Sequence, residues 1–454
     1  MRDLTQGAIW KHLASMALFT AMGLIVQTLY LLIDLYFVSR LGKEAVAGVA
    51  TSGTSMFLTM SVSQLVAVGA LSLISQAIGR KDQADAQTVF EQSLTMSLTI
   101  GAVMVALGYW LGRPLISLVA ADQATADNGV TYFYWFLPAL ASLFPGAALG
   151  PALRASGVVG APMMIQSATV VLNVLLAPIL IAGWLTGHPM GVMGAGLASS
   201  IASGFGTIAL FMLFNRVQKH MHLSRLHKPN FAIWSRITKI GLPSTGEFGL
   251  MFIISSVLYW GIQSFGPQAQ AGFGIGSRVM QSIFLPAMAV AFAAAPIAGQ
   301  NFGAQKGARV RATFAHAAIV SSTIMLSLTL LCQISPHVLV APFTKDPAVI
   351  TAAVDYLRIS SWNFVAVGMT FTCSGMFQAL GDTRPALISS ASRLLFYVAP
   401  AIWLKAQPWV VLHDFWYLSV ASLTLQMAIS LWLLRRELHH KLQFAAPQMA
   451  TPPL

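Results

Sequence analysis

Charge is scarce in this sequence. Only 9% of its 454 residues are Asp, Glu, Lys or Arg, while 56% are hydrophobic, and a typical soluble domain is about 25% charged. Water could not solvate a surface with so few charges. Apolar runs long enough to cross a bilayer recur along the whole chain. The sequence therefore excludes an ordinary soluble protein and predicts an all-α integral membrane protein.

Cysteine is also rare. Cys332 and Cys373 both lie inside apolar segments, which excludes a disulfide framework and a thiolate metal cluster of the usual spacing. The sequence has no G-x-x-x-x-G-K-[ST] phosphate loop, no HExxH motif and no G-x-S-x-G nucleophile elbow. We therefore predict that the protein is not an enzyme and needs no cofactor.

The basic residues give a net charge of +12, but they do not cluster with stacking aromatic residues, so no nucleic acid partner is predicted. With the N-terminus inside the cell, 18 Lys and Arg residues fall in the loops and tails on the inner side and five in the outer loops. Cytoplasmic loops of membrane proteins carry such an excess. We therefore predict a multi-pass protein of the inner or plasma membrane with both termini in the cytoplasm.

The apolar runs predict about twelve transmembrane helices. We expect them near residues 14–39, 46–78, 88–111, 130–155, 161–184, 190–215, 237–263, 270–300, 312–342, 350–378, 385–405 and 412–434. The most polar stretch of the chain follows the sixth run. The predicted division is an N-terminal six-helix lobe (1–215), a basic cytoplasmic linker (216–236), a C-terminal six-helix lobe (237–434) and a cytoplasmic tail (435–454).

An internal repeat relates the two predicted lobes. Residues 42–79 align without gaps on residues 266–303, at an offset of 224, and ten of the 38 aligned positions are identical. Because each lobe has an even number of helices, both enter the membrane from the same side and form a parallel repeat. We therefore expect substrate to bind between two six-helix bundles, as in a secondary transporter.

Most acidic residues lie in predicted loops or near the ends of predicted spans, but Asp34 and Glu247 do not. A carboxylate in hydrocarbon costs several kcal/mol, so it usually faces a cavity or a partner and handles an ion or a substrate. A purely structural hydrogen bond is the alternative for each. Arg278, Arg358 and Arg393 also lie near membrane depth and must extend to the interface, pair or face water.

Several segments together resemble the multidrug and toxic compound extrusion (MATE) transporters. They are the run DLYFVSRLG at 34–42, AVAG at 45–48, GLP at 241–243, QNFG at 300–303 and GDT at 381–383. The resemblance covers essentially the whole chain. It implies twelve helices in two bundles and the export of bulky, often cationic organic compounds in exchange for H⁺ or Na⁺.

The resemblance also implies a coupling site in the N-terminal lobe. Asp34 holds the position of the family's main coupling aspartate, Asn173 matches an asparagine on the fifth helix, and Ser199 is the best match for a small hydroxyl residue on the sixth. From its sequence context alone, Asn173 could equally form an interhelical hydrogen bond. No metal is expected beyond Na⁺ at Asp34.

Two positions depart from the family pattern. Many relatives have an aspartate four residues after that asparagine, where this chain has Ala177, and the loss of a carboxylate ligand disfavours a tight Na⁺ site. Some relatives have a proline about fifteen residues before the coupling aspartate, where this chain has Phe19. The first departure favours proton coupling through Asp34. The second argues against a proline-driven bend of the first helix.

In the C-terminal lobe, the resemblance implies a second cation or substrate site. The family's seventh-helix glutamate would fall at Met251, while this chain has Glu247 one turn earlier on the same helical face. Asn363 and Trp362 on the tenth helix are expected neighbours, with core packing as the alternative.

The predicted partners are small organic molecules, H⁺ or Na⁺ and the lipid bilayer, and the predicted protein is a monomer. Two other functions stay open. A flippase for lipid-linked precursors from the same superfamily would usually have about fourteen helices and a more cationic cleft. A passive membrane channel would not need a two-lobe repeat.

Overall fold

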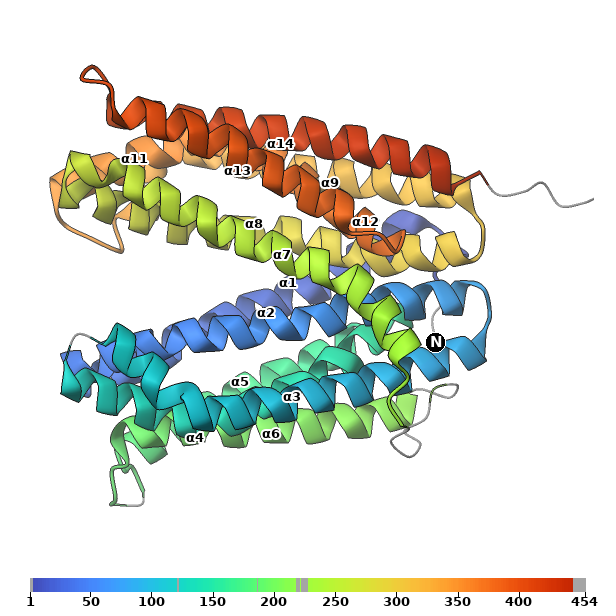
Figure 1. Ribbon diagram of the computed structural model, residues 1–454, viewed down its shortest axis with the longest axis horizontal. Helices are drawn as coiled ribbons and strands as arrows, with labels where there is room; N and C mark the ends of the chain where they lie inside the picture. Colours follow the sequence, from blue (N-terminus) through green and yellow to red (C-terminus); the bar gives the residue numbers. More distant parts are fainter. Residues whose placement is uncertain (1–2, 121, 186, 218–220, 222–227, 444–454) are drawn as a thin grey trace, which may run out of the picture.

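The computed structural model describes residues 3–120, 122–185, 187–217, 221 and 228–443, without the side chains of residues 31, 32, 34, 35, 54, 55, 57 and 58. All regular structure in this part of the chain is helical, and it forms two bundles that lie one above the other in Figure 1. The first residues and the end of the last helix lie at the same end of the molecule.

The N-terminal bundle contains six helices, and α4 packs against α2, α3 and α6 at its centre. The helices are α1 (Ile9–Ser39), α2 (Lys43–Gly79), α3 (Gln83–Val119), α4 (Gln123–Ala155), α5 (Gly160–Ile181) and α6 (Gly191–Val217).

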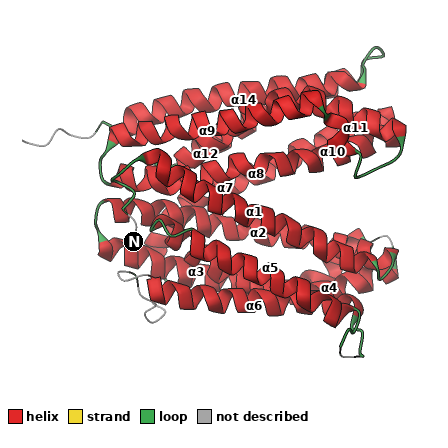
Figure 2. Ribbon diagram, turned by 180° about the vertical axis from the view of Figure 1, so that it is seen from behind, coloured by secondary structure: helices red, strands yellow, loops and turns green. Residues whose placement is uncertain are grey.

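The C-terminal bundle contains eight α-helices and two short 3₁₀ turns, and α8 packs against α9, α11 and α12. The elements are α7 (Phe231–Ile262), η1 (Gln263–Phe265), α8 (Pro267–Gly303), α9 (Gly307–Ile334), α10 (Pro336–Val340), α11 (Pro347–Ser360), η2 (Ser361–Asn363), α12 (Phe364–Ala379), α13 (Arg384–Lys405) and α14 (Leu412–Lys441). Both views show only helices connected by loops (Figure 2).

Eleven helices within the described part of the chain are long and apolar enough to cross a membrane. The expected tenth span, 350–378, is divided between α11 and α12 by the η2 turn at Ser361–Asn363. These two helices together supply the twelfth crossing, which confirms the predicted fold of about twelve transmembrane helices in two bundles.

The repeat at 224 residues extends well beyond the segment in which the sequence reveals it. The α2, α4 and α5 ranges reappear 224 residues later as α8, the range from α11 to α12, and α13. Gly42 and Gly266 precede α2 and α8 with φ of 117° and 92°, and Lys81 and Gln305 follow them with φ of 60° and 59°. The two lobes therefore have the same arrangement of helices over these ranges, and single residues at the turns have the same backbone conformation.

The helices extend beyond several expected ends. α6 continues to Val217, α7 begins at Phe231, and α14 continues to Lys441. Nine of the 21 residues of the predicted linker and the last eleven of the predicted tail lie outside the described residues, so the division into linker and tail stays a prediction. The helices are longer because basic side chains let a helix continue into the aqueous interface.

The two lobes are joined at the end of the molecule where the chain begins. The buried Gln300 amide on α8 accepts a hydrogen bond from the N–H of Leu4 (3.0 Å) and donates one to the carbonyl of Ala155 at the end of α4 (2.6 Å). Arg309 on α9 donates to the carbonyl of Gly7 at 3.0 Å. The first residues of the chain are thereby tied to both bundles.

Candidate functional site

The N-terminal lobe holds a buried polar cluster on three helices. Asn173 on α5 and Ser199 on α6 are both 0% exposed, and the Asn173 amide donates to the Ser199 hydroxyl oxygen at 3.2 Å. The Tyr30 hydroxyl on α1 donates to the same oxygen at 2.7 Å. The structure therefore brings together two of the three predicted coupling residues and adds Tyr30.

Asp34 lies on α1, but its side chain is outside the described part of the structure. It follows Tyr30 by four residues, and residues at that spacing share one face of a helix. Its backbone position therefore belongs to the face of α1 that carries the Tyr30 contact with Ser199. Tyr30 was not singled out from the sequence, although its spacing from Asp34 is a usable signal.

The second polar atom of the Asn173 side chain is its amide oxygen. The Asn173 Oδ1 atom has no hydrogen-bond partner among the described residues, and an orphaned buried acceptor costs about 1–3 kcal/mol. Oxygen atoms of this kind, together with hydroxyls and a carboxylate, are the donors that a hard cation prefers. The cluster could accommodate a proton on Asp34 or a small cation.

The structure shows the surroundings of Ala177 and Phe19, the two positions that depart from the family pattern. Ala177 is 0% exposed and lies one turn after Asn173 on α5, so the cluster lacks a carboxylate at that place. α1 is one continuous helix that contains no proline, and Phe19 is 37% exposed on it. The helix geometry at Phe19 is that of an ordinary α-helix.

The C-terminal lobe encloses a cavity of about 210 Å³. Glu247 and Met251 on α7 and Asn363 at the η2 turn all line it, so the structure gathers the three predicted residues around one space. Asn363 is 3% exposed and donates to the carbonyl of Ser419 at 3.4 Å. Trp362 is 69% exposed and does not line this cavity, because the 3₁₀ turn directs neighbouring side chains apart.

Glu247 lies between this cavity and a smaller void. Its carboxylate accepts a hydrogen bond from the Ser374 hydroxyl on α12 at 2.8 Å. The smaller void, of about 40 Å³, is lined by Glu247 and Met251 together with Gln64 and Val68 of α2. Among the described residues that line either space, Glu247 is the one acidic residue.

The three arginines near membrane depth separate into two groups. Arg278 and Arg358 are exposed, which agrees with side chains that extend toward water or lipid head groups. Arg393 on α13 lines the C-lobe cavity, as do Ser390 and Gln426, which are joined by a 3.0 Å hydrogen bond. No feature of the sequence indicates that Ser390 and Gln426 belong to this cavity.

The repeat relates the two polar regions. The residues 224 positions after Tyr30, Asp34 and Ser199 are Ile254, Leu258 and Leu423, and all three line the C-lobe cavity. The aligned positions therefore have different side chains in the two lobes. In the N-terminal lobe they belong to a polar cluster. In the C-terminal lobe they form an apolar wall, and the ionisable side chains of that cavity come from positions outside this set.

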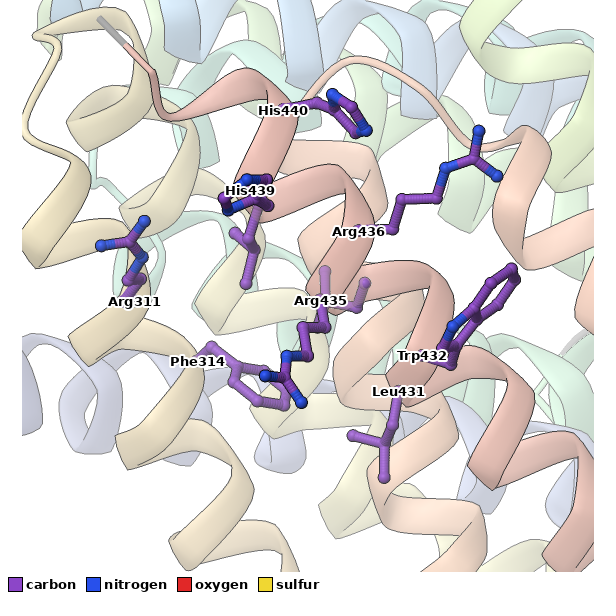
Figure 3. Close-up of a pocket in the computed structure, with 10 residues that line it drawn as sticks. Arg311, Phe314, Leu431, Trp432, Arg435, Arg436, His439 and His440 are labelled. Carbon is purple, nitrogen blue, oxygen red and sulfur yellow. The ribbon is translucent and has the colours of Figure 1, made fainter.

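A larger and more open groove lies between α9 and α14, near the end of the molecule where the chain begins. Its volume is about 770 Å³, and Arg311, Arg435, Arg436 and His439 line it. In Figure 3 Arg311 projects from one helix and Arg435 from the other, across a gap floored by Phe314. These side chains face the molecular surface, so the groove is separate from both membrane-depth sites.

The MatE family model matches residues 20–179 and 243–403. The multidrug export protein MepA of Staphylococcus haemolyticus is 25% identical over 394 residues, which cover 86% of this chain and 85% of that protein. The probable multidrug resistance protein YoeA of Bacillus subtilis is 22% identical over 389 residues, which cover 84% of each.

Solved structures show the same fold. One is a MOP superfamily transporter from Pyrococcus furiosus, described as having a binding pocket of reverse polarity that suggests a different function. Its TM-score is 0.90 and its sequence identity is 21%, and the match covers 97% of this chain and 98% of that one. An outward-facing multidrug resistance MATE transporter has a TM-score of 0.89 and 22% identity, covering 98% of each chain.

Proposed function

The chain belongs to the MatE family, and on that premise we propose that it is an antiporter that exports bulky, often cationic amphipathic compounds in exchange for H⁺ or Na⁺. Its place is the inner or plasma membrane, with both termini in the cytoplasm, and it acts as a monomer. The multidrug export function of MepA, a relative that aligns over 86% of this chain, supports the substrate class.

The observation that carries the proposal is the buried hydrogen-bonded cluster of Tyr30, Ser199 and Asn173, on the same helix face as Asp34. Polar groups at membrane depth are costly, and their usual role is to handle ions or substrate. The cluster joins α1, α5 and α6, so a change in its hydrogen bonds alters the packing of three helices at once.

Asp34 is the coupling carboxylate in this proposal. An ionised carboxylate only accepts hydrogen bonds, whereas a protonated one also donates, so proton binding changes which partners among Tyr30, Ser199 and Asn173 are satisfied. The proton favours one packing of the helices and the substrate favours the other. Each ligand thereby shifts the population that the other needs.

The test is transport by the purified protein in proteoliposomes. A fluorescent cationic dye is loaded, and a proton gradient and a sodium gradient are imposed separately. We expect one gradient to drive dye efflux, and Asp34→Asn to reduce that efflux by at least tenfold because it removes the ionisable group. Asp127→Asn is the matched control, since Asp127 pairs with Arg113 at an exposed position.

Full efflux by Asp34→Asn would contradict the coupling role. Dye flux of equal size with and without an ion gradient would instead support a passive channel. A flippase for lipid-linked precursors would move a labelled lipid and not the dye.

A further inference from the structure

Two side chains of opposite charge line the C-lobe cavity without pairing. Glu247 reaches it from α7 and Arg393 from α13. The ion pairs formed among the described residues involve neither of them. Glu247 has the Ser374 hydroxyl as its close partner. The cavity therefore has one acidic and one basic side chain in its wall.

Unsatisfied polar atoms are found at the positive side. The Nε atom of Arg393 is buried and has no hydrogen-bond partner among the described residues. The Oε1 atom of Gln426, a residue that is only 5% exposed, also has none. Buried polar groups in folded proteins are nearly always paired, so Arg393 and Gln426 both carry polar atoms that the described part of the protein does not satisfy.

We propose that the C-lobe cavity binds a compact aromatic zwitterion, with its protonated amine at Glu247 and its carboxylate at Arg393. The inference rests on the proposed export function for its role in transport, and it assigns to this small cavity a zwitterion in place of the bulky, often cationic compounds proposed for the transporter as a whole. A guanidinium is suited to a carboxylate because its planar donors can form two parallel hydrogen bonds.

The aromatic part of the ligand follows from the cavity's walls and size. Phe284, Tyr356 and Phe371 line the space, and aromatic rings pack favourably against one another in offset or edge-to-face arrangements. The volume of about 210 Å³ lies below the range of roughly 300–1,000 Å³ typical of sites for drug-sized ligands. A ligand with one ring between its two charges fits these limits.

The two wall charges select against ligands of one charge. A simple cation would pair with Glu247 and leave the guanidinium of Arg393 unpaired and repulsive. A simple anion would pair with Arg393 and be repelled by Glu247. Only a ligand that carries both charges satisfies both groups, and the unpaired charge in each other complex acts as the discriminating element.

The experiment compares three ligands of nearly equal shape by isothermal titration calorimetry on the full-length protein in lipid nanodiscs. They are 4-(aminomethyl)benzoate, a zwitterion; 4-methylbenzylamine, a cation; and 4-methylbenzoate, an anion. We expect the zwitterion to bind at least tenfold more tightly than either of the others. Equal affinity for the zwitterion and the cation would overturn the proposal.

Variants assign the preference to the two residues. Arg393→Gln should remove the advantage of the zwitterion over the cation, and Glu247→Gln should remove its advantage over the anion. Arg393→Lys should keep the order of affinities, which separates loss of charge from loss of fold. Arg278→Gln, at an exposed position on α8, is the matched control and should leave all three affinities unchanged.

Dye efflux, measured on the same preparations, keeps this inference apart from the proposed function. Gradient-driven dye efflux without a preference for the zwitterion would overturn the inference alone. A zwitterion preference that depends on Arg393, in a protein that exports neither dye nor zwitterion, would uphold the binding site and overturn the proposed export.

Discussion

Gly79 and Gln300 approach so closely that a Cβ atom on Gly79 would lie 2.1 Å from the carbonyl oxygen of Gln300. The repeat generates the reciprocal contact, because a Cβ on Gly303 would lie 2.0 Å from the carbonyl oxygen of Gln76. α2 and α8 thus cross backbone to backbone. The crossing lies at the end of the molecule where the chain begins, and the two bundles diverge toward the opposite end (Figure 1).

This contact predicts that Gly79→Ala and Gly303→Ala weaken the junction between the lobes. The added methyl group meets backbone atoms, which cannot rotate away, and overpacking of this kind costs about 1–3 kcal/mol. We expect the melting temperature in detergent to fall by several degrees, as about 1–3 kcal/mol would produce in a chain of this size.

Gly204→Ala is the control, because a Cβ at Gly204 meets nothing within 4 Å. Alanine also has the higher helix propensity, so this variant should be at least as stable as the original protein. Melting temperatures for Gly79→Ala that match those of Gly204→Ala would contradict the close crossing.

A second prediction concerns the attachment of the first residues. Gln300→Leu removes the acceptor for the Leu4 N–H and the donor to the Ala155 carbonyl, and each orphaned buried group costs about 1–3 kcal/mol. We expect hydrogen exchange at residues 4–7 to become at least tenfold faster. Gln407→Leu is the control, because Gln407 bonds only to the exposed Trp403 carbonyl of its own turn. Unchanged exchange in Gln300→Leu would show that Asn301, Lys306 and Arg309, which donate to the carbonyls of Leu4, Thr5 and Gly7, suffice to hold this segment.

A third prediction tests the N-lobe cluster as a unit. Ser199→Ala should destabilise the protein by about 1–3 kcal/mol, because it removes the oxygen that accepts from the buried Asn173 amide and from the Tyr30 hydroxyl. In a double-mutant cycle with Asn173→Ala, measured by thermal unfolding, the two losses should fall short of additivity by at least 0.5 kcal/mol. Additive losses would mean that the two side chains do not depend on each other.

Hydrophobicity predicted the spans well because each helix must cross the same thickness of hydrocarbon. It could not predict the η2 break before Asn363, since an apolar run has the same composition whether its backbone is straight or broken. Pro138, one of the residues 224 positions before the break, lies inside the continuous α4 helix, so even the repeat gives no warning.

The residues of the two candidate sites could also be predicted only in part. The resemblance named Asn173 and Ser199 for one site, and a hydrogen bond joins them. Helix periodicity placed Glu247 and Met251 on one face, and both line the C-lobe cavity. The functional roles of these residues stay predictions. Sequence reasoning did not single out Tyr30 or Gln426, and it left open whether Arg393 faces a cavity, because these features depend on which neighbouring helix covers which face. That arrangement is a property of tertiary packing, and a single sequence carries little information about it.

The last prediction concerns the missing carboxylate. Ala177 is buried one turn from Asn173, at the position where the family pattern often has an aspartate. Ala177→Asp would add a second carboxylate to the cluster, and without a bound cation this buried charge should destabilise the protein by several kcal/mol. Sodium should then restore stability by mass action, by about 2.7 kcal/mol at a concentration one hundred times its dissociation constant.

The measurement is the melting temperature from 0 to roughly 100 mM NaCl against matched choline chloride, a range chosen to bracket weak binding. Ala177→Asn is the control of equal shape, which should show no sodium-specific shift. If Ala177→Asp is no more sensitive to sodium than Ala177→Asn, the cluster of Tyr30, Asn173 and Ser199 is not arranged to hold a cation, and proton coupling through Asp34 is the mechanism that the geometry favours.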